Sequence, residues 1–137
     1  MITIKHGSIF DSTADVLVCP VNCVGVMGKG LALEFKRRWP EMYDTYRKWT
    51  FMCAISAGEV HIIDRVMIAA TKEHWRNPSR IEWVDACLAA IAEAPPVSIA
   101  LPQLGCGCGG LDWADVWPLY EKHLGGLDCD VEVWIWL

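Results

Sequence analysis

The sequence has no long hydrophobic run and no leader-like start. About 20 consecutive apolar residues are needed to cross a bilayer, and no stretch of the 137 residues approaches that length. The opening MITIKHGSIF lacks the basic region, apolar run and small-residue cleavage site of a signal peptide. We therefore expect a soluble, intracellular protein of the cytoplasm, with no membrane partner.

An excess of positive charge is also missing, since the formal net charge is −5. This argues against a protein that coats nucleic acid without regard to sequence, because such binding depends on many lysine and arginine contacts to phosphate. Local contact with a nucleotide or a strand end stays open, although solvated helix faces would explain the first basic segment equally well. The two basic segments contain Lys36, Arg37, Arg38, Arg47 and Lys48, and Lys72, His74, Arg76 and Arg80.

The cysteines do not form a recognisable framework. Their number, seven, is odd, and several fall in expected strands or on helix faces, which favours free thiols over disulfides. The C-x-C pair of Cys106 and Cys108 has no second pair at zinc-finger spacing, and His61 and His74 have no C-x2-C partner. We expect neither a metal nor another cofactor.

The chain is long enough for one domain, and no repeat, low-complexity segment or linker divides it. A chain of 137 residues buries about two thirds of its unfolded surface. We expect a single domain over residues 1–137 that is a monomer.

Strand and helix patterns alternate along the sequence. Apolar or β-branched runs predict strands at 2–5, 15–19, 60–63, 66–70, 97–101 and 131–136. Helical spacing predicts helices at 30–38, 41–50 and 112–123, and one between Ser79 and Pro95. This order favours an α/β sheet between helical layers, with the ligand at the carboxyl ends of the strands.

Two further features concern side chains in these elements. Ser79 and Glu82 match a capping box, and the helix that follows should bury Trp83, Ala86, Cys87, Ala90 and Ile91. The tryptophans expected in the core are Trp39, Trp83, Trp117, Trp134 and Trp136, whereas Trp75 and Trp113 lie beside loops and are candidates for ligand contact.

Two glycine-rich loops each follow a buried strand. Residues 20–33 read PVNCVGVMGKGLAL and residues 101–113 read LPQLGCGCGGLDW. Glycine allows close approach of the backbone, and the helix after each loop offers unpaired N–H groups at a positive dipole end. The pair predicts a diphosphate held between the loops. The first loop is neither the G-x-G-x-x-G of dehydrogenases nor the G-K-[ST] of nucleotide triphosphatases.

The segments VNCVGVMGKGLALEFKRRWP, TKEHWR and LPQLGCGCGGLDW together resemble the macrodomain family, most closely its DarG-type DNA ADP-ribosyl glycohydrolases. The similarity extends over essentially the whole chain. It implies a three-layer α/β/α macrodomain with a mixed six-stranded sheet, and ADP-ribose as the ligand.

The resemblance also implies roles for individual residues. Gly7, Ser8 and Ile9 would lie at the adenine, with Ser8 in place of the family aspartate, and Asn22 would orient the distal ribose, although it can equally bond a turn of the backbone. The residues implied along the diphosphate are Val26, Met27, Gly28, Lys29 and Gly30 in the first loop, and Leu104, Gly105, Cys106, Gly107, Cys108 and Gly109 in the second.

By the same resemblance Lys72 is the catalytic nucleophile, attacking the anomeric carbon of the distal ribose. An ammonium has no lone pair, and an ordinary lysine pKa of about 10.4 leaves little free amine at neutrality. Desolvation or cationic neighbours such as Lys29, His74 and Arg76 would have to help. Without the surrounding motif, Lys72 would read as an exposed loop lysine.

Other positions bear on the substrate. Relatives that act on protein-linked ADP-ribose carry an aspartate where this chain has Gly109, and Asp112 reads as a helix cap rather than an acid. His74, Trp75 and Arg76 offer an aromatic plane and cations for DNA, or simply shield the core.

The expected function is removal of ADP-ribose from a nucleobase, thymidine in single-stranded DNA, reversing the action of a cognate ADP-ribosyltransferase toxin. The alternatives are its removal from acidic protein side chains, dephosphorylation of an ADP-ribose phosphate, and a binding module without turnover.

Overall fold

The computed structural model describes residues 1–136 and contains one mixed sheet of six strands. The strands are β1 (Ile2–His6), β2 (Val16–Asn22), β3 (Val60–Ile63), β4 (Val66–Lys72), β5 (Ser98–Leu101) and β6 (Asp130–Ile135). Their order across the sheet is β1-β6-β5-β2-β4-β3. The neighbours are parallel except at one edge, where β3 runs antiparallel to β4. This confirms the predicted fold class.

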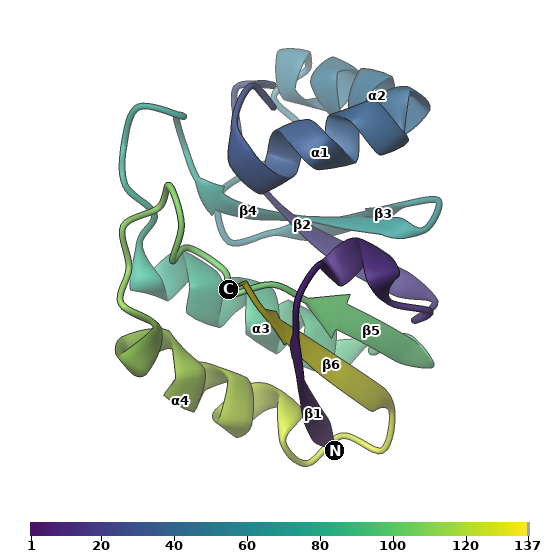
Figure 1. Ribbon diagram of the computed structural model, residues 1–137. Coiled ribbons are helices and arrows are strands. Elements are labelled where there is room, and N and C mark those ends of the chain that lie inside the picture. Colours follow the sequence, from purple (N-terminus) through teal and green to yellow (C-terminus); the bar gives the residue numbers. More distant parts are fainter. Residues whose placement is uncertain (137) are drawn as a thin grey trace.

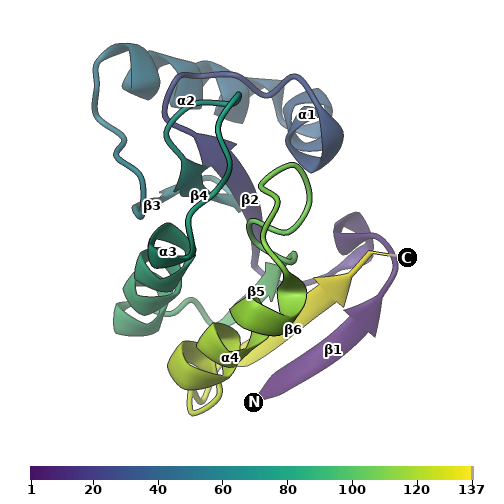
Figure 2. The ribbon, with the colours of Figure 1, turned by 90° about the vertical axis from the view of Figure 1, so that its left-hand side faces the viewer.

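Helices cover both faces of the sheet (Figure 1). The helices α1 (Gly30–Arg38) and α2 (Pro40–Phe51) lie on one face, and α3 (Ile81–Glu93) and α4 (Trp113–Leu124) lie on the other. A short 3₁₀ helix, η1 (Ile9–Asp11), follows β1 on the side of α1. Figure 2, turned by 90°, shows the same three layers from the side.

The alternation of side chains in β2 divides the core into two clusters. Val16 and Val18 pack toward α3 and α4, whereas Leu17, Cys19 and Val21 pack toward α1 and α2. Because successive strand residues point to opposite faces, a continuous apolar run serves both layers at once. All seven cysteines are free thiols, and each lies within residues 1–136.

The two central strands separate toward their carboxyl ends. Within the described chain, β2 pairs with β5 only through Val16↔Ile99 and Leu17↔Ala100, whereas β2 stays paired with β4 as far as Asn22. From β2 and β5 the chain continues to opposite sides of the sheet, as at the switch point where α/β proteins bind ligands. The separation opens space between the two glycine-rich loops.

Several element ends differ from the predicted ones. The sequence predicts that β2 stops before Pro20, but the strand continues to Asn22, because beyond Leu17 no partner on β5 requires the missing proline N–H. Thr71 and Lys72, expected in a loop, are the last residues of β4. Pro40 does not merely end α1 but occupies the first turn of α2, where its fixed φ suits a helix start.

Of two predictions about α3, one is wrong and the other is right only in part. Ser79 is not its cap: Arg80 holds that position without a side-chain bond, and the Ser79 hydroxyl instead lies 3.4 Å from that of Thr71. The buried stripe consists of Val84, Cys87, Leu88 and Ile91, so Cys87 and Ile91 are buried as predicted, whereas Val84 and Leu88 take the places expected for Trp83, Ala86 and Ala90. Ala86 is exposed and Trp83 is only half-buried, and the Arg80 guanidinium lies over the Trp83 ring, 5.2 Å from its centre.

Trp136 was also expected in the core, but 67% of its surface is exposed. It follows the last residue of β6, beyond the helices that cover that strand. Of the helices within residues 1–136, none combines the length and apolar character needed to cross a membrane.

Candidate functional site

A cavity of about 1150 Å³ lies at the carboxyl ends of the parallel strands. At one end it is bounded by Gly7, Ile9 and Trp134, near the ends of β1 and β6, and at the other by Asn22 and Lys72, which end β2 and β4. Neighbouring strands lie about 4.8 Å apart, so the four steps from β1 to β4 span about 19 Å. The cavity is therefore long enough for an extended ligand.

Asn22 holds the first glycine-rich loop in place. Its side-chain amide donates to the Val26 carbonyl over 2.8 Å, and its Oδ1 accepts from the backbone N–H groups of Val24 (3.1 Å) and Val26 (3.3 Å). The buried Tyr46 hydroxyl reaches the Asn22 carbonyl at 2.7 Å and the Oδ1 at 3.0 Å. Asn22 thus makes the local backbone bonds expected of a turn while lining the cavity.

The second glycine-rich loop packs tightly at Gly109. A Cβ there would lie 2.4 Å from both the Gly105 carbonyl oxygen and the Ser79 hydroxyl, far inside contact distance. The Gly109 carbonyl also accepts from the Ser79 backbone N–H over 3.0 Å. This position has no room for the aspartate side chain that the resemblance associates with protein-directed relatives.

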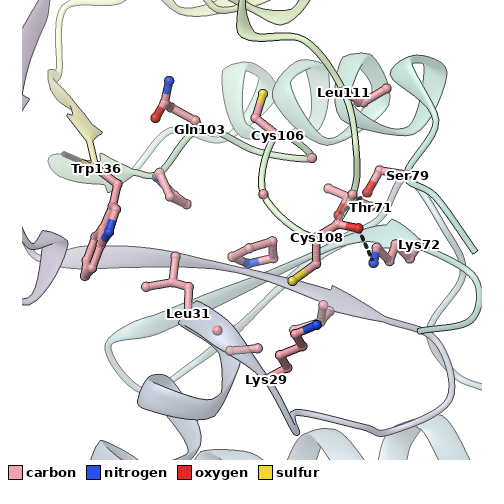
Figure 3. A pocket seen from close by; sticks show the side chains of 18 of the residues that line it. Lys29, Leu31, Thr71, Lys72, Ser79, Gln103, Cys106, Cys108, Leu111 and Trp136 are labelled. Atoms are coloured by element: carbon pink, nitrogen blue, oxygen red, sulfur yellow. Dashed lines mark hydrogen bonds between the residues drawn. The ribbon is translucent and has the colours of Figure 1, made fainter. Parts of the chain in front are cut away.

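Lys72 joins β4 to the second loop. Its Nζ donates to the Cys108 carbonyl over 3.0 Å, as Figure 3 shows, and its Cα pairs with that of Asn22 on the neighbouring strand. The Cys108 Sγ lies 3.8 Å from where a Cβ on Gly30 would stand, so the two loops approach each other here. A carbonyl oxygen can only accept, so the Lys72 amine is the donor in this contact.

Most of the predicted ligand residues line the cavity. They are Gly7, Ile9, Asn22, Val26, Gly28, Lys29, Gly30, Lys72, Trp75, Gly105, Cys106, Gly107, Cys108 and Gly109.

Five predicted residues are not among the lining residues. Met27 and Leu104 are buried in the core and anchor the two loops. The Ser8 hydroxyl accepts from the Phe10 backbone N–H over 3.3 Å and caps η1. His74 and Arg76 flank the lining residue Trp75 instead.

The segment of His74, Trp75 and Arg76 forms a stacked group at the cavity rim. The Arg76 guanidinium lies 4.8 Å from the centre of the Trp75 ring, and the His74 and Trp75 ring centres are 5.3 Å apart. The Arg76 backbone N–H donates to His74 Nδ1 over 3.1 Å. Trp75 remains 46% exposed, so the group presents an aromatic plane with a cation to solvent.

Sequence reasoning missed several lining residues. Trp134 lies in β6 and Trp136 directly follows that strand, and Trp134 is oriented by donating its indole N–H to Glu132 over 2.9 Å. Gln103 lies in the second loop, and Glu34 projects from α1. Trp113, predicted as a candidate for ligand contact, does line the cavity. The rule that ligands bind at the carboxyl ends of parallel strands could have identified the β6 residues, once β6 was placed beside β5.

The Cys106 thiol in the cavity wall is poorly suited to nucleophilic chemistry. Burial, and secondarily the nearby Asp112 carboxylate, raises the pKa of Cys106 to about 11, so the thiol stays protonated at neutral pH. In the part of the chain that the structure describes, no three His, Cys, Asp or Glu side chains gather closely enough to hold a metal ion.

Comparison with known sequences gives a family. The profile of the Macro domain family matches residues 18–120. A curated relative from Mycobacterium tuberculosis, named DNA ADP-ribosyl glycohydrolase, is 42% identical over 128 residues, covering 85% of this chain and 36% of the relative. A DNA ADP-ribosyl transferase-DNA ADP-ribosyl glycohydrolase fusion protein from Thermosipho africanus is 29% identical over 161 residues, covering 98% of this chain and 42% of the fusion protein. The chain thus spans less than half the length of these relatives.

Solved structures agree with this comparison. The macrodomain of Mycobacterium tuberculosis DarG superposes with a TM-score of 0.93 at 39% identity, covering 98% of this chain and 97% of that one. Thermosipho africanus DarTG in complex with ADP-ribose gives a TM-score of 0.87 at 30% identity, covering 96% of this chain and 41% of that one. The resemblance seen in the sequence is confirmed, and this chain belongs to the Macro domain family.

Proposed function

We propose that this macro domain binds ADP-ribose and removes it from DNA, as a DNA ADP-ribosyl glycohydrolase, with thymidine in single-stranded DNA as the modified nucleoside. The names of the M. tuberculosis relative and of the ADP-ribose complex support this assignment. So does the cavity, whose two glycine-rich walls suit a diphosphate.

The observation that carries the proposal is the place of Lys72. Its amine stands at one end of the cavity, in hydrogen-bond contact with the backbone of the second loop at Cys108. A nucleophile held by a loop that binds the diphosphate is positioned relative to the sugar attached to that diphosphate. In this proposal Asn22, whose Cα pairs with that of Lys72 on the adjacent strand, orients the same sugar.

In the proposed reaction, Lys72 acts as a neutral amine. Its lone pair forms a bond to the anomeric carbon of the distal ribose while the bond from that carbon to the base breaks. The bonding electrons leave with the base, which takes up the proton that the attacking nitrogen sheds. Water then hydrolyses the adduct, releasing ADP-ribose and restoring the amine. This sequence uses no metal or other cofactor.

Removal of ADP-ribose from acidic protein side chains is the second candidate. The tight packing at Gly109 disfavours it, because no carboxylate can be placed at that point of the second loop without moving the Gly105 carbonyl. A binding module without turnover needs the two loops but not Lys72. Both alternatives make distinct predictions about Lys72 and the substrate.

The natural substrate would be supplied by an ADP-ribosyltransferase that modifies DNA. The fusion protein from T. africanus, whose name joins a DNA ADP-ribosyl transferase to a DNA ADP-ribosyl glycohydrolase, supports such a partner. This chain would then act as the antitoxin that reverses the modification.

The test compares two substrates and two lysines of the cavity wall. A single-stranded oligonucleotide with one ADP-ribosylated thymidine and a peptide with ADP-ribosylated glutamate are incubated with the unaltered protein, Lys72→Ala and Lys29→Ala, and free ADP-ribose is quantified. Calorimetry with ADP-ribose measures binding. We expect release from DNA alone, and a loss on the order of 10³-fold in Lys72→Ala with binding retained.

Each other outcome rejects a part of the proposal. Unchanged release of ADP-ribose by Lys72→Ala would exclude Lys72 as the nucleophile. A greater loss of release in Lys29→Ala than in Lys72→Ala would instead indicate that Lys29 in the first loop is the nucleophile. Release from glutamate but not from DNA would favour the protein-directed alternative. Binding without release from either substrate would leave a binding module.

A further inference from the structure

The carboxyl-terminal end of α2 exposes large apolar side chains beside basic ones. Phe51 is 90% exposed and Met52 is 71% exposed. A surface hollow of about 450 Å³ lies here, lined by Asp44, Arg47, Lys48, Phe51 and Met52. We call these five residues the α2 surface. No step of the proposed reaction uses it.

The α2 surface adjoins the first glycine-rich loop. The Arg47 Cγ lies 3.6 Å from the position of a Cβ on Gly25, and the Thr50 Oγ1 lies 2.6 Å from it. Gly25 precedes Val26, which lines the cavity. In Figure 1 the end of α2 lies directly above this loop, and Figure 2 shows it on the same side of the molecule as the loop between β4 and α3 that carries Trp75.

The side chains of the α2 surface suit a single nucleic-acid strand. Arg47 and Phe51 are four residues apart, so they share one face of α2. An exposed aromatic ring offers a stacking plane that accepts any base, and neighbouring cations contact the phosphates that join the bases. The α2 surface contains two cations, Arg47 and Lys48, and one carboxylate, that of Asp44, so its formal charge is positive.

We propose that the α2 surface binds the single-stranded DNA that flanks the modified nucleotide. The inference rests on the proposed function, because it requires a substrate that extends beyond ADP-ribose and one base. Arg47 and Phe51 are one helical turn apart, about 6 Å, and stacked nucleotides advance about 3.4 Å each. A strand leaving the cavity past Val26 therefore reaches Phe51 within a few nucleotides.

A protein partner fits this surface less well. Stable protein interfaces bury about 800 Å² on each side around an apolar centre. The apolar part of the α2 surface consists of two side chains, with charged residues directly beside them. In a single strand, planar bases alternate with phosphates, which matches the neighbouring ring and cations of the α2 surface. The broad apolar patch of a protein partner would match them less closely.

The experiment compares substrates of different length. The kcat/KM for release of ADP-ribose is measured on an ADP-ribosylated thymidine nucleotide and on a nine-nucleotide strand with the modification at its centre. The unaltered protein should prefer the longer substrate. Phe51→Ala should lower kcat/KM on the longer substrate by about tenfold, the size expected for one lost base stack. It should leave the single nucleotide unaffected, because that substrate does not reach Phe51.

Arg47→Ala provides a second, independent variant. It should also lower kcat/KM on the longer substrate. It should reduce the slope of log KM against log salt by the amount expected for the loss of about one phosphate contact. The matched controls are Val97→Ala, which alters a side chain 79% exposed just before β5, and Lys122→Ala, which removes an exposed charge from α4. Both controls should keep the preference for the longer substrate.

The outcomes separate the two proposals. If the unaltered protein releases ADP-ribose from neither substrate, the proposed function fails. If it cleaves both, but Phe51→Ala and Arg47→Ala keep the full preference for the longer one, the function stands and the α2 surface is not a DNA site. A dimer seen by light scattering that Phe51→Ala dissociates would overturn the inference in favour of contact between two copies.

Discussion

Gly109 has no space for any side chain, because the Gly105 carbonyl oxygen and the Ser79 hydroxyl both occupy the position of its Cβ. We predict that Gly109→Ala lowers the free energy of unfolding by about 1–3 kcal/mol. It should also weaken ADP-ribose binding, because the second loop must shift to admit the methyl group. Urea denaturation and calorimetry with ADP-ribose measure the two effects.

Gly107 in the same loop is the matched control. Nothing lies within 4 Å of a Cβ at that position, so Gly107→Ala should change the free energy of unfolding by less than about 0.5 kcal/mol. Equal effects of the two substitutions would show that the close contact at Gly109 does not constrain the loop.

At single residues the sequence predicted the composition of the site better than the bonds within it. The two loops, Asn22 and Lys72 all line the cavity, as expected from their motifs. The Lys72 contact to the Cys108 carbonyl could not be predicted, because any residue type at position 108 offers the same backbone oxygen. The capping bond of Ser8 could not be predicted for a related reason, because a short polar side chain has several possible hydrogen-bond partners within reach.

At the level of elements, the start of α4 tests whether Asp112 is a cap or an acid. Its carboxylate accepts from the Ala114 backbone N–H over 3.0 Å and also lines the cavity. Asparagine caps a helix as well as aspartate does but cannot act as a general acid. We predict that Asp112→Asn keeps both stability and release of ADP-ribose, whereas Asp112→Ala loses about 1 kcal/mol of stability.

Denaturation curves and release rates of these two variants give the answer. If Asp112→Asn folds with unchanged stability but releases ADP-ribose far more slowly, the carboxylate takes part in the chemistry and the cap assignment is incomplete.

The type of each predicted helix and strand could be read from periodicity, but their ends and rotations depended on tertiary packing. The pattern in α3 placed Trp83 in the buried stripe because of its apolar ring, yet the Arg80 side chain covers that ring on the surface. The extension of β2 through Pro20 follows from its separation from β5, a relation between strands about 80 residues apart in sequence.

At the level of the whole molecule, the buried thiols should make the free energy of unfolding decrease at alkaline pH. Burial raises the pKa of Cys87 to about 12 and also raises the pKa of Cys19. In the unfolded chain these thiols ionise near pH 8.5, about their ordinary pKa. Between about pH 9 and 11 the unfolded state loses protons that the folded state keeps, so the free energy of unfolding falls with rising pH.

The expected slope is about 1.4 kcal/mol per pH unit for each thiol that stays protonated in the folded protein. Urea denaturation from pH 7 to 10.5 measures it, and Cys87→Ala should show a shallower decline than the unaltered protein. A stability that is constant over this range would contradict the burial of these thiols.

The layers of the molecule followed from the alternation of strands and helices, but the cavity did not. It depends on the separation of β2 from β5 and on Trp134 and Trp136 at the end of β6, which meet the glycine-rich loops only once the strand order is known. The two loops and the family could be predicted from the sequence, whereas the extent of the cavity from β1 to β4 depends on the strand order.

The measurement that tests the central claim most directly is chemical trapping of the sugar on the enzyme. The protein is mixed with an ADP-ribosylated oligonucleotide and treated with borohydride during turnover, which reduces the ring-opened imine form of the sugar adduct to a stable secondary amine, and it is then analysed by intact mass and peptide mapping. The account predicts a reduced adduct on Lys72 with the mass of ADP-ribose less one oxygen atom, and none in Lys72→Ala. Complete release of ADP-ribose without any adduct on Lys72, or an adduct on another residue, would contradict it.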